Sequence, residues 1–446
     1  MTFSIVQKSQ LEGADRIDPE YYQPEYIRSK DVLFAHNLKY LSDLCKVTDG
    51  NHMSISNNFT NTGVRYLRGK DLQDFFISDS DPIFIPEGEY VKLKRSYIYQ
   101  NDVLVSIVGT VGLVSVVPDK FEKITGSCKI AILHTKTIQP NFLAAFLTSK
   151  YGQFQLKRKT AGAVQMGIIL QDLSNVLIPD FSESAQEKIA LIVKSSYETG
   201  ESSKNLYEQA ESLLLEELGL KDFIVPNDLS YIVNYSDAEK VDRVDADYFQ
   251  PKYDYLINKL GNKKRLSEFA TKINPSIRIE PNKEYNYIEI SDVNVGSGEV
   301  IFNRITGKEL PANAKVKISG GELIISKVRP TRGAIAIIPG EFNQDFVASG
   351  AFSTFIINSP SREYLQVVLR SFIGKLQMER PTTGTSYPTI TDEDVENILI
   401  PNLKIEIQQK ISNLVKKSHE ARKKSKELLE EAKRKVEEMI EANITK

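Results

Sequence analysis

The amino-acid sequence predicts an α+β fold in which two tandem mixed α/β domains are each followed by a long helix. Three observations predict this fold: pairs of matching segments, short strand-like runs between them, and two long helical stretches. The chain has 446 residues, more than one ordinary hydrophobic core needs, which also favours several domains. We therefore expect an internal repeat with pseudo-twofold symmetry.

Two pairs of segments carry the repeat. Residues 16–26 (RIDPEYYQPEY) match residues 243–253 (RVDADYFQPKY) at six identical positions, at a shift of 227 residues. Residues 175–193 match residues 397–415 at eight of nineteen positions, at a shift of 222, and both begin with Asn-x-Leu-Ile-Pro. The two landmarks keep their order and nearly their separation, so a tandem duplication explains them better than chance.

Each copy has the pattern of a mixed α/β domain. Short β-branched and aromatic runs separated by Gly, Pro and Asn predict strands, and residues 139–159 and 361–380 predict helices. A long helical stretch then follows each Leu-Ile-Pro segment. The expected organisation is a first domain over residues 1–181, a first long helix over 182–220, a linker and second domain over 221–402, and a second long helix over 403–446.

The two long helical stretches share one heptad pattern with small and polar residues at its centre, which predicts close approach to a partner. Residues 181–239 carry 4 Lys and Arg against 12 Asp and Glu, whereas residues 403–446 carry 12 against 8, so each helix is a natural partner for the other. The alternative is that each helix packs on its own domain. The predicted seam positions are Ile189, Ile192, Ser196, Thr199, Ser203, Leu206, Ala210 and Leu213 in the first helix and Ile411, Leu414, Ser418, Ala421, Ser425, Leu428, Ala432 and Lys435 in the second.

Composition excludes several classes of protein. The longest apolar stretch, residues 103–117, contains Gly, Ser and Thr and is too short for a membrane span, so buried strands are expected there. The first residues show no secretory signal, which predicts a cytoplasmic protein. Two cysteines and four scattered histidines do not form a metal-ligand spacing. The net charge of −2 lacks the basic footprint that is usual for a nucleic-acid-binding protein.

The sequence also lacks the motifs of covalent chemistry. The glycine-rich stretches at 109–112 and 296–298 precede no predicted helix and lack the lysine of a phosphate loop, so they are interpreted as turns. No acidic cluster with a nearby lysine suggests a nuclease, and no aromatic tetrapeptide suggests amino-methylation of a flipped base. Ser, Cys and His do not form a nucleophile signature. We therefore expect a non-catalytic chain with no cofactor of its own.

The repeated motifs resemble those of a known family, the specificity subunits of type I restriction-modification systems. The resemblance rests on Asp18, Tyr21 and Pro24, which recur 227 residues later, and on each Leu-Ile-Pro segment that leads into a Gln-containing helix start. It covers essentially the whole chain. It implies two target recognition domains that each read one half of a split double-stranded DNA site, held apart by the two helices as an antiparallel coiled coil.

The resemblance also implies partners and candidate residues. Two methyltransferase subunits and endonuclease/translocase subunits would assemble on the chain, and S-adenosylmethionine, ATP and magnesium would belong to them. Such partners can neutralise much of the phosphate charge, which leaves local basic loops for this chain. The candidate DNA-contacting residues in these loops are Arg65, Arg68, Lys70, Lys92, Lys94, Arg95, Lys157, Arg158 and Lys159 in the first domain and Lys327, Arg329 and Arg332 in the second.

A second group of candidates lies in the small-residue loops before the Leu-Ile-Pro segments, TAGAVQ at 160–165 and TTGTSYP at 382–388. Gln165 could pair with adenine, and Tyr387 could stack or contact phosphate. Arginine is weighted above lysine for base reading because it can bind guanine through two hydrogen bonds. The alternatives are that the basic residues are solvated surface charges and that the loops are turns which only close the domain.

Two other functions remain open from the sequence. The chain could be a stand-alone enzyme that modifies or cleaves DNA, which turnover by the purified protein would reveal. It could instead be a coiled-coil scaffold with two protein-binding domains, which would show no sequence preference on DNA. The base sequence and spacer that the protein recognises cannot be deduced from one sequence.

Overall fold

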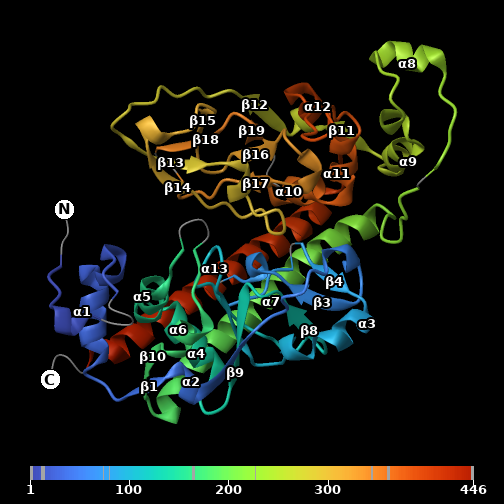
Figure 1. Ribbon diagram of the computed structural model, residues 1–446. Helices are drawn as coiled ribbons and strands as arrows, with labels where there is room; N and C mark the ends of the chain where they lie inside the picture. The colour runs from blue at the N-terminus through green and yellow to red at the C-terminus, as the bar shows by residue number, and fades with distance from the viewer. Residues whose placement is uncertain are drawn as a thin grey trace. The chain divides into compact units, whose positions relative to one another are not determined.

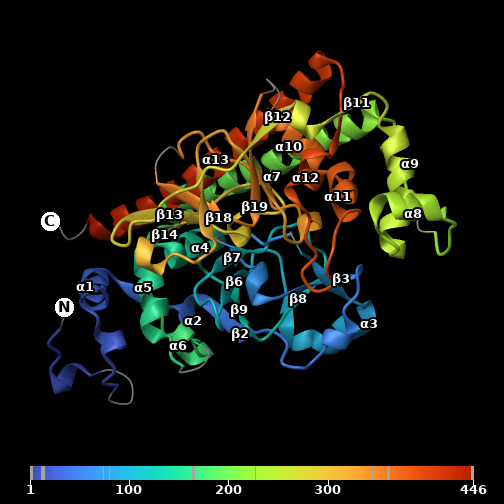
Figure 2. The same cartoon turned by 90° about the horizontal axis from the view of Figure 1, so that it is seen from above.

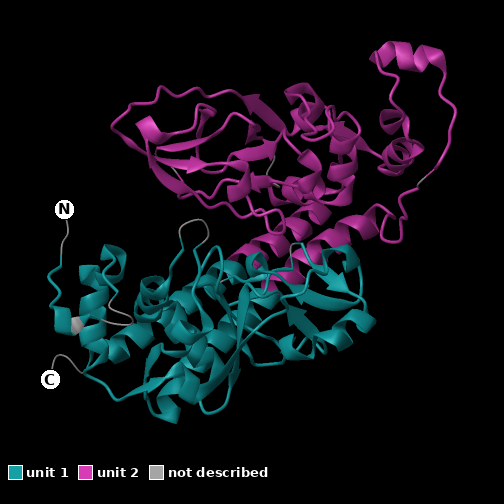
Figure 3. Ribbon diagram, viewed as in Figure 1, with its two compact units in different colours: residues 1–201, 421–446 teal, residues 202–420 magenta. Residues whose placement is uncertain are grey.

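The computed structural model describes residues 4–11, 16–73, 75–79, 81–162, 166–226, 228–342, 345–358 and 362–442. The chain divides into two compact units, residues 1–201 with 421–446 and residues 202–420 (Figure 3). Each unit contains one mixed α/β domain and a part of each of the two longest helices. Within the described ranges, no helix is long and apolar enough to cross a membrane.

The described part of the first unit has six short α-helices and ten strands before its first long helix. The helices are α1 (Pro24–Leu33), α2 (Leu41–Leu44), α3 (Glu87–Tyr90), α4 (Pro140–Thr148), α5 (Lys150–Lys159) and α6 (Leu170–Ser174). The strands are β1 (Leu38–Tyr40), β2 (Cys45–Asp49), β3 (Val64–Leu67), β4 (Ile83–Ile85), β5 (Tyr97–Ile98), β6 (Val103–Ser106), β7 (Val114–Val116), β8 (Ile124–Gly126), β9 (Ile130–Thr135) and β10 (Leu177–Pro179).

These strands form three sheets, with orders β2-β9-β6-β7, β4-β3-β8-β5 and β1-β10 (Figure 1). Among the described strands of this unit, every pair is antiparallel except β3 with β8, where Arg65 lies opposite Ile124. Strands β6 and β7 lie within the apolar stretch at 103–117 and are buried along most of their length, as that stretch predicts. Helix α4 is almost wholly buried, and its apolar side chains pack in the core of this domain.

The second unit repeats this series of elements. Its helices before the last are α8 (Tyr235–Val241), α9 (Pro251–Lys259), α10 (Arg362–Arg370), α11 (Phe372–Glu379) and α12 (Asp392–Glu396). Its strands are β11 (Lys263–Arg265), β12 (Ala270–Ile273), β13 (Glu284–Ile288), β14 (Asn303–Thr306), β15 (Ala314–Ile318), β16 (Leu323–Ser326), β17 (Ile335–Ile337), β18 (Phe346–Ser349), β19 (Phe352–Ile357) and β20 (Leu399–Pro401).

The sheets of the second unit have the same topology as those of the first. Their orders are β12-β19-β16-β17, β14-β13-β18-β15 and β11-β20, and the single parallel pair, β13 with β18, corresponds to β3 with β8. The predicted α+β fold with a tandem repeat is therefore confirmed. The match of sheet orders extends the repeat through the region where the two sequences have diverged.

A repeated glutamine binds each Leu-Ile-Pro segment to a helix of the same domain. Gln155 of α5 donates from Nε2 to the Leu177 carbonyl at 2.9 Å and accepts from the Leu177 amide at 2.8 Å. Gln377 of α11 makes the same two bonds with Leu399, at 2.9 and 2.7 Å. One side-chain amide thus satisfies both polar backbone groups of a leucine at the end of a two-stranded sheet, where a neighbouring strand would otherwise do so.

The two long helices are α7 (Glu183–Glu217) and α13 (Ile405–Glu441), and within each unit their parts lie side by side (Figures 1 and 2). In the first unit, Ser196 Oγ donates to the Ser425 carbonyl at 2.7 Å and Ser425 Oγ donates back to the Ser196 carbonyl at 2.8 Å. In the second unit, Ser203 and Ser418 make the same reciprocal bonds, both at 2.7 Å. Each unit therefore holds one reciprocal serine pair between its parts of the two helices.

Half of the predicted seam is correct and half is displaced by one residue. Ile189, Ser196, Ser203 and Ala210 of α7 are buried, as are their counterparts in α13, in agreement with the heptad prediction. The intervening buried positions, however, include Val193 and Leu214 rather than Ile192 and Leu213. In α13 the corresponding buried residues are Val415, Leu429 and Val436 rather than Leu414, Leu428 and Lys435. Spacings of three and four residues fit the predicted set of positions and the buried set equally well. Which set is buried depends on the side of the helix that the domain core covers.

Candidate nucleic-acid interface

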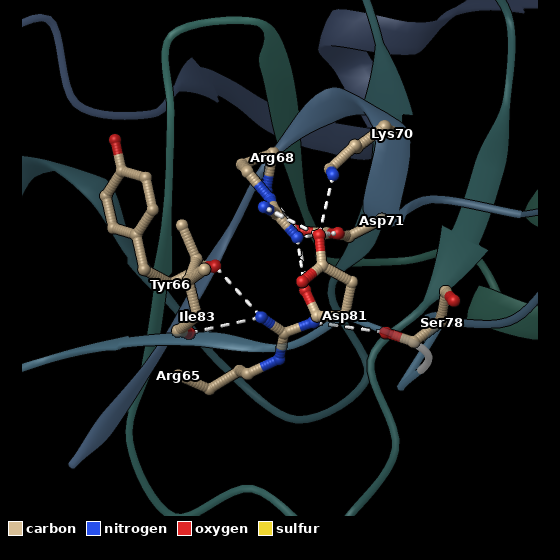
Figure 4. A network of polar contacts seen from close by, with 8 residues as sticks. All are labelled: Arg65, Tyr66, Arg68, Lys70, Asp71, Ser78, Asp81 and Ile83. Atoms are coloured by element: carbon tan, nitrogen blue, oxygen red, sulfur yellow. Dashed lines mark hydrogen bonds and ion pairs between the residues drawn. The ribbon is translucent and has the colours of Figure 1, made fainter. Parts of the chain in front are cut away.

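Arg65 is the most buried of the candidate residues and faces the interior of the first unit. Its side chain is 3% exposed, and the guanidinium donates to the carbonyls of Tyr66, Ser78 and Ile83 at 3.0 to 3.1 Å (Figure 4). Burial lowers the pKa of Arg65, partly offset by the nearby Asp71. Arg65 lies in strand β3 and not in the expected loop, and its guanidinium holds the β3–β4 connection to the sheet.

Arg68 and Lys70 lie on the same connection and are held by carboxylates. Arg68 forms two bonds with Asp71, from Nε at 3.0 Å and from Nη2 at 2.8 Å, and also contacts Asp81 (Figure 4). Lys70 Nζ lies 2.7 Å from Asp81. The hydrogen bond with Asp71 raises the pKa of Arg68, and the hydrogen bond with Lys70 lowers the pKa of Asp81. These cations are largely neutralised, although the Lys70 side chain remains exposed.

A basic turn, residues 92–95, lies in the 3-10 helix η5 (Val91–Ser96). Lys92, Lys94 and Arg95 are exposed, and the Arg95 side chain is 77% exposed. Arg95 Nη2 lies 3.0 Å from Asp49 Oδ1, and His52 Nε2 lies 2.5 Å from the other oxygen of the same carboxylate. Sequence reasoning missed Asp49 and His52, since a single acid and a single histidine carry no spacing signal.

The basic run at the end of α5 is divided between surface and structure. Lys157 is exposed and Lys159 is half-buried. Arg158 donates from Nε to the Tyr21 carbonyl at 2.8 Å, and its guanidinium lies 4.1 Å from the centre of the Tyr21 ring. Arg16 lies over the same ring at 4.4 Å.

This arrangement recurs in the second unit, where Tyr248 lies 4.5 Å from Arg243 and 5.0 Å from Arg380. Arg16 also pairs with Asp18, and Arg243 pairs with Asp245. The repeated Arg-x-Asp-x-x-Tyr motif therefore attaches the first residues of each domain to the end of a helix, α5 in the first unit and α11 in the second, by cation–π and hydrogen-bond contacts. Arg158 has a structural role in this contact.

In the second unit, Lys327 is neutralised by a carboxylate. Its Nζ lies 3.0 Å from Asp392 Oδ1, and Lys272 and Ser353 also contact Asp392, at 2.9 and 2.5 Å. Burial raises the pKa of Asp392, but the hydrogen bonds from Ser353, Lys272 and Lys327 outweigh it and lower the pKa to about 2. The ion pair with Asp392 thus holds Lys327 in place at the start of the β16–β17 turn.

Arg329 and Tyr387 come from loops that are 58 positions apart in the sequence, and the fold brings them into contact. The Arg329 guanidinium lies 4.4 Å from the centre of the Tyr387 ring, and Nη2 donates to the Ser386 carbonyl at 3.1 Å. The backbones of the two loops are joined as well, by Arg329 N to the Pro388 carbonyl and Ile390 N to the Lys327 carbonyl. Tyr387 is 66% exposed, and Arg332 is exposed in the same turn.

The first unit joins the equivalent loops by the same backbone bonds. Gly109 N donates to the Met166 carbonyl and Ile168 N donates to the Ile107 carbonyl, each at 3.0 Å. Gln165, the adenine-pairing candidate of this loop, lies outside the described residues. In both units the fold therefore brings together the β6–β7 or β16–β17 turn and the small-residue loop before the Leu-Ile-Pro strand.

The described part of the chain offers no group of three or more His, Cys, Asp or Glu that could hold a metal ion. One linear arrangement of polar groups stands out: Asp102 contacts His134 Nδ1 at 2.9 Å, and His134 Nε2 lies 3.3 Å from Thr48 Oγ1. Asp102 also accepts from the Tyr99 amide, and Glu322 accepts from the Ser319 amide at the equivalent turn. We interpret Asp102 as a turn-capping residue, which explains an acid at this position in both units.

Residues 37–212 match the family model of the type I restriction modification DNA specificity domain. A search of the curated proteins finds no match. Matching solved structures include the S subunit of a type I restriction-modification system from M. genitalium, at 13% identity and a TM-score of 0.40, with 91% of this chain and 95% of that chain covered. Another is the HsdS subunit from Thermoanaerobacter tengcongensis, at 16% identity and a TM-score of 0.32, with 92% and 97% covered.

The region over residues 37–212 is therefore similar to a DNA specificity domain. Over these residues the match agrees with the resemblance of the repeated motifs to the specificity subunits of type I restriction-modification systems. The match ends at residue 212, and the second unit repeats the sheet topology of the matched region.

Proposed function

We propose that the chain is the non-catalytic recognition subunit that binds a bipartite, asymmetric DNA target. Residues 1–181 and 221–402 act as the two target recognition domains, and each reads its own half of the site. The long helices connect them and set the length of the spacer. The asymmetry follows from the different side chains that the two domains present on equivalent loops.

The pair of joined loops in each unit is the observation that carries this proposal. The backbone bonds that join the loops are the same in both units, whereas the residues on them differ: Gly109 of the first unit corresponds to Arg329 of the second. A constant framework with variable loops is suited to reading different base sequences in one orientation. The framework positions the protein on the DNA, and contacts from the loops to base edges determine which sequence is bound. The exposed candidates for DNA contact are Lys70, Lys92, Lys94, Arg95, Lys157, Arg332 and Tyr387, and Arg329 is a half-buried candidate.

We further propose that two methyltransferase subunits and, in the full complex, endonuclease/translocase subunits supply the chemistry. The family match supports this assignment, since a specificity subunit acts through an enzyme that it directs to DNA. The overall charge of −2 also supports it, because partners would have to provide much of the phosphate neutralisation.

Reconstitution tests the proposal. The purified chain is mixed with duplex DNA and S-adenosylmethionine, with and without its native methyltransferase subunits, and methyl transfer is measured. We expect transfer to defined sequences only when the partners are present. Methyl transfer or cleavage by the chain alone would identify it as an enzyme, and binding of the complex without sequence preference would identify it as a scaffold.

A further inference from the structure

We propose that Arg329 reads a guanine in the half-site bound by the second unit, and that Tyr387 and Ser386 hold its guanidinium for this task. The proposal rests on the proposed function, since it requires the second unit to bind DNA. It adds a specificity-determining residue, a base identity, and the two residues that position it.

The backbone conformation of Arg329 is the first step of the argument. Its φ of 48° and ψ of 53° lie in the left-handed region, which residues with a side chain rarely occupy. Pro330 follows, and a proline restricts the preceding residue to extended conformations. Arg329 is therefore strained, and such strain is typical of functional positions.

The first unit shows what the turn itself requires. Gly109, the equivalent residue, has a φ of 85°, so the left-handed conformation belongs to the fold of this turn. Glycine adopts that conformation without steric cost. A Cβ atom added at Gly109 would meet nothing within 4 Å, so a side chain at this position extends into open space. The second unit thus places an arginine where glycine would suffice for folding, and packing does not require it.

The surroundings of Arg329 hold the guanidinium without neutralising it. The Tyr387 ring and the Ser386 carbonyl fix its plane, at 4.4 Å and 3.1 Å, and no carboxylate pairs with it among the residues the structure describes. Lys327, two residues earlier, is by contrast paired with Asp392. A planar, oriented and uncompensated guanidinium matches the O6 and N7 acceptors of guanine in the major groove.

The test selects binding sites from a duplex library with both half-sites randomised, using the chain assembled with its methyltransferase partners. The wild-type complex should enrich one bipartite motif. Arg329→Gly should enrich the same motif except that one guanine in the second half-site becomes any base, a loss of roughly 10- to 100-fold in preference. Glycine suits the left-handed turn, so the melting temperature of this variant should equal or exceed that of the wild type.

Two further variants separate reading from general attraction. Arg332→Ala removes an exposed cation from the same turn and should weaken binding to all sequences while leaving the motif unchanged. Tyr387→Ala keeps Arg329 but frees its guanidinium, so the preference for guanine should fall at the position that Arg329→Gly alters.

The outcomes distinguish this proposal from the proposed function. If the wild-type complex enriches no motif, the proposed function fails. If the wild type enriches a motif and Arg329→Gly enriches the same one, the proposal for Arg329 is overturned while the function stands. A folded Arg329→Gly complex that enriches nothing also overturns it, because Arg329 would then contribute affinity and not base identity.

Discussion

The basic residues of the candidate interface differ in the groups that surround their charge. Arg65 is surrounded by carbonyls inside the domain, Lys327 is paired with Asp392, and Arg329 is stacked on an exposed ring. All three belong to short basic groups in the sequence, and the sequence carries no signal that distinguishes their roles. Their different roles follow from burial and from carboxylates that lie far away in the chain.

Asp392 gives a prediction at the scale of the residue. Its pKa is lowered to about 2, against roughly 3.9 in an unfolded chain, so its ionised form stabilises the second unit above about pH 4. This contribution is lost as the pH falls from about 4 to 2. Asp392→Asn should therefore lower the free energy of unfolding near neutral pH by on the order of 2 kcal/mol, and much less near pH 2.

Denaturant titration of both proteins at a series of pH values measures this difference. Glu393→Gln, which alters an exposed carboxylate on the same short helix, is the matched control and should change stability little at any pH. A deficit of Asp392→Asn that stays constant down to pH 2 would show that the carboxylate is not held ionised by its three partners.

At the scale of the element, the serine pairs explain how α7 and α13 approach closely. Ser196 with Ser425 and Ser203 with Ser418 exchange hydroxyl-to-carbonyl bonds, and all four serines are buried. Gly200 lies next to the first pair, where an added Cβ would lie 3.2 Å from Ser425 Oγ. Small polar residues in the seam, which offer little hydrophobic stabilisation, are therefore used for close contact and interhelical hydrogen bonds.

The two serine pairs are one heptad apart in each helix, which suggests an insertion experiment. Seven residues are inserted between Ser196 and Ser203 and seven between Ser418 and Ser425, so that both pairs keep their partners. The insertion adds about 10 Å of helix, or roughly three base pairs. If the helices set the spacer, mapping of methylated bases should show unchanged half-sites with a longer spacer.

An insertion into α7 alone is the control, because it shifts Ser203 out of register with Ser418 when Ser196 stays paired with Ser425, and should abolish methylation at every spacing. Methylation by the double insertion only at the original spacing would indicate that another part of the complex fixes the distance. The added helix also rotates the second half-site around the duplex, so total activity can fall without affecting this conclusion.

For the whole molecule, the sequence predicts the fold far better than the site. The matches at 16–26 with 243–253 and at 175–193 with 397–415 are enough to predict a duplicated α+β unit, because these segments form the entry to each domain and the sheet that leads to each long helix. The seam is predicted only in part, since steps of three and four fit two phases. Burial of Arg65 and stacking of Arg329 depend on contacts between distant loops, which composition and spacing do not contain.

The central claim, that each unit reads its own half of a bipartite target, is tested most directly by exchange. Residues 54–165 are replaced by the corresponding region of a related specificity subunit, and the methylated motif is mapped in the genome. We predict that the half-site read by the first unit changes, while the other half-site and the spacer stay the same. A change in both half-sites, or in neither, would contradict independent reading by the two units.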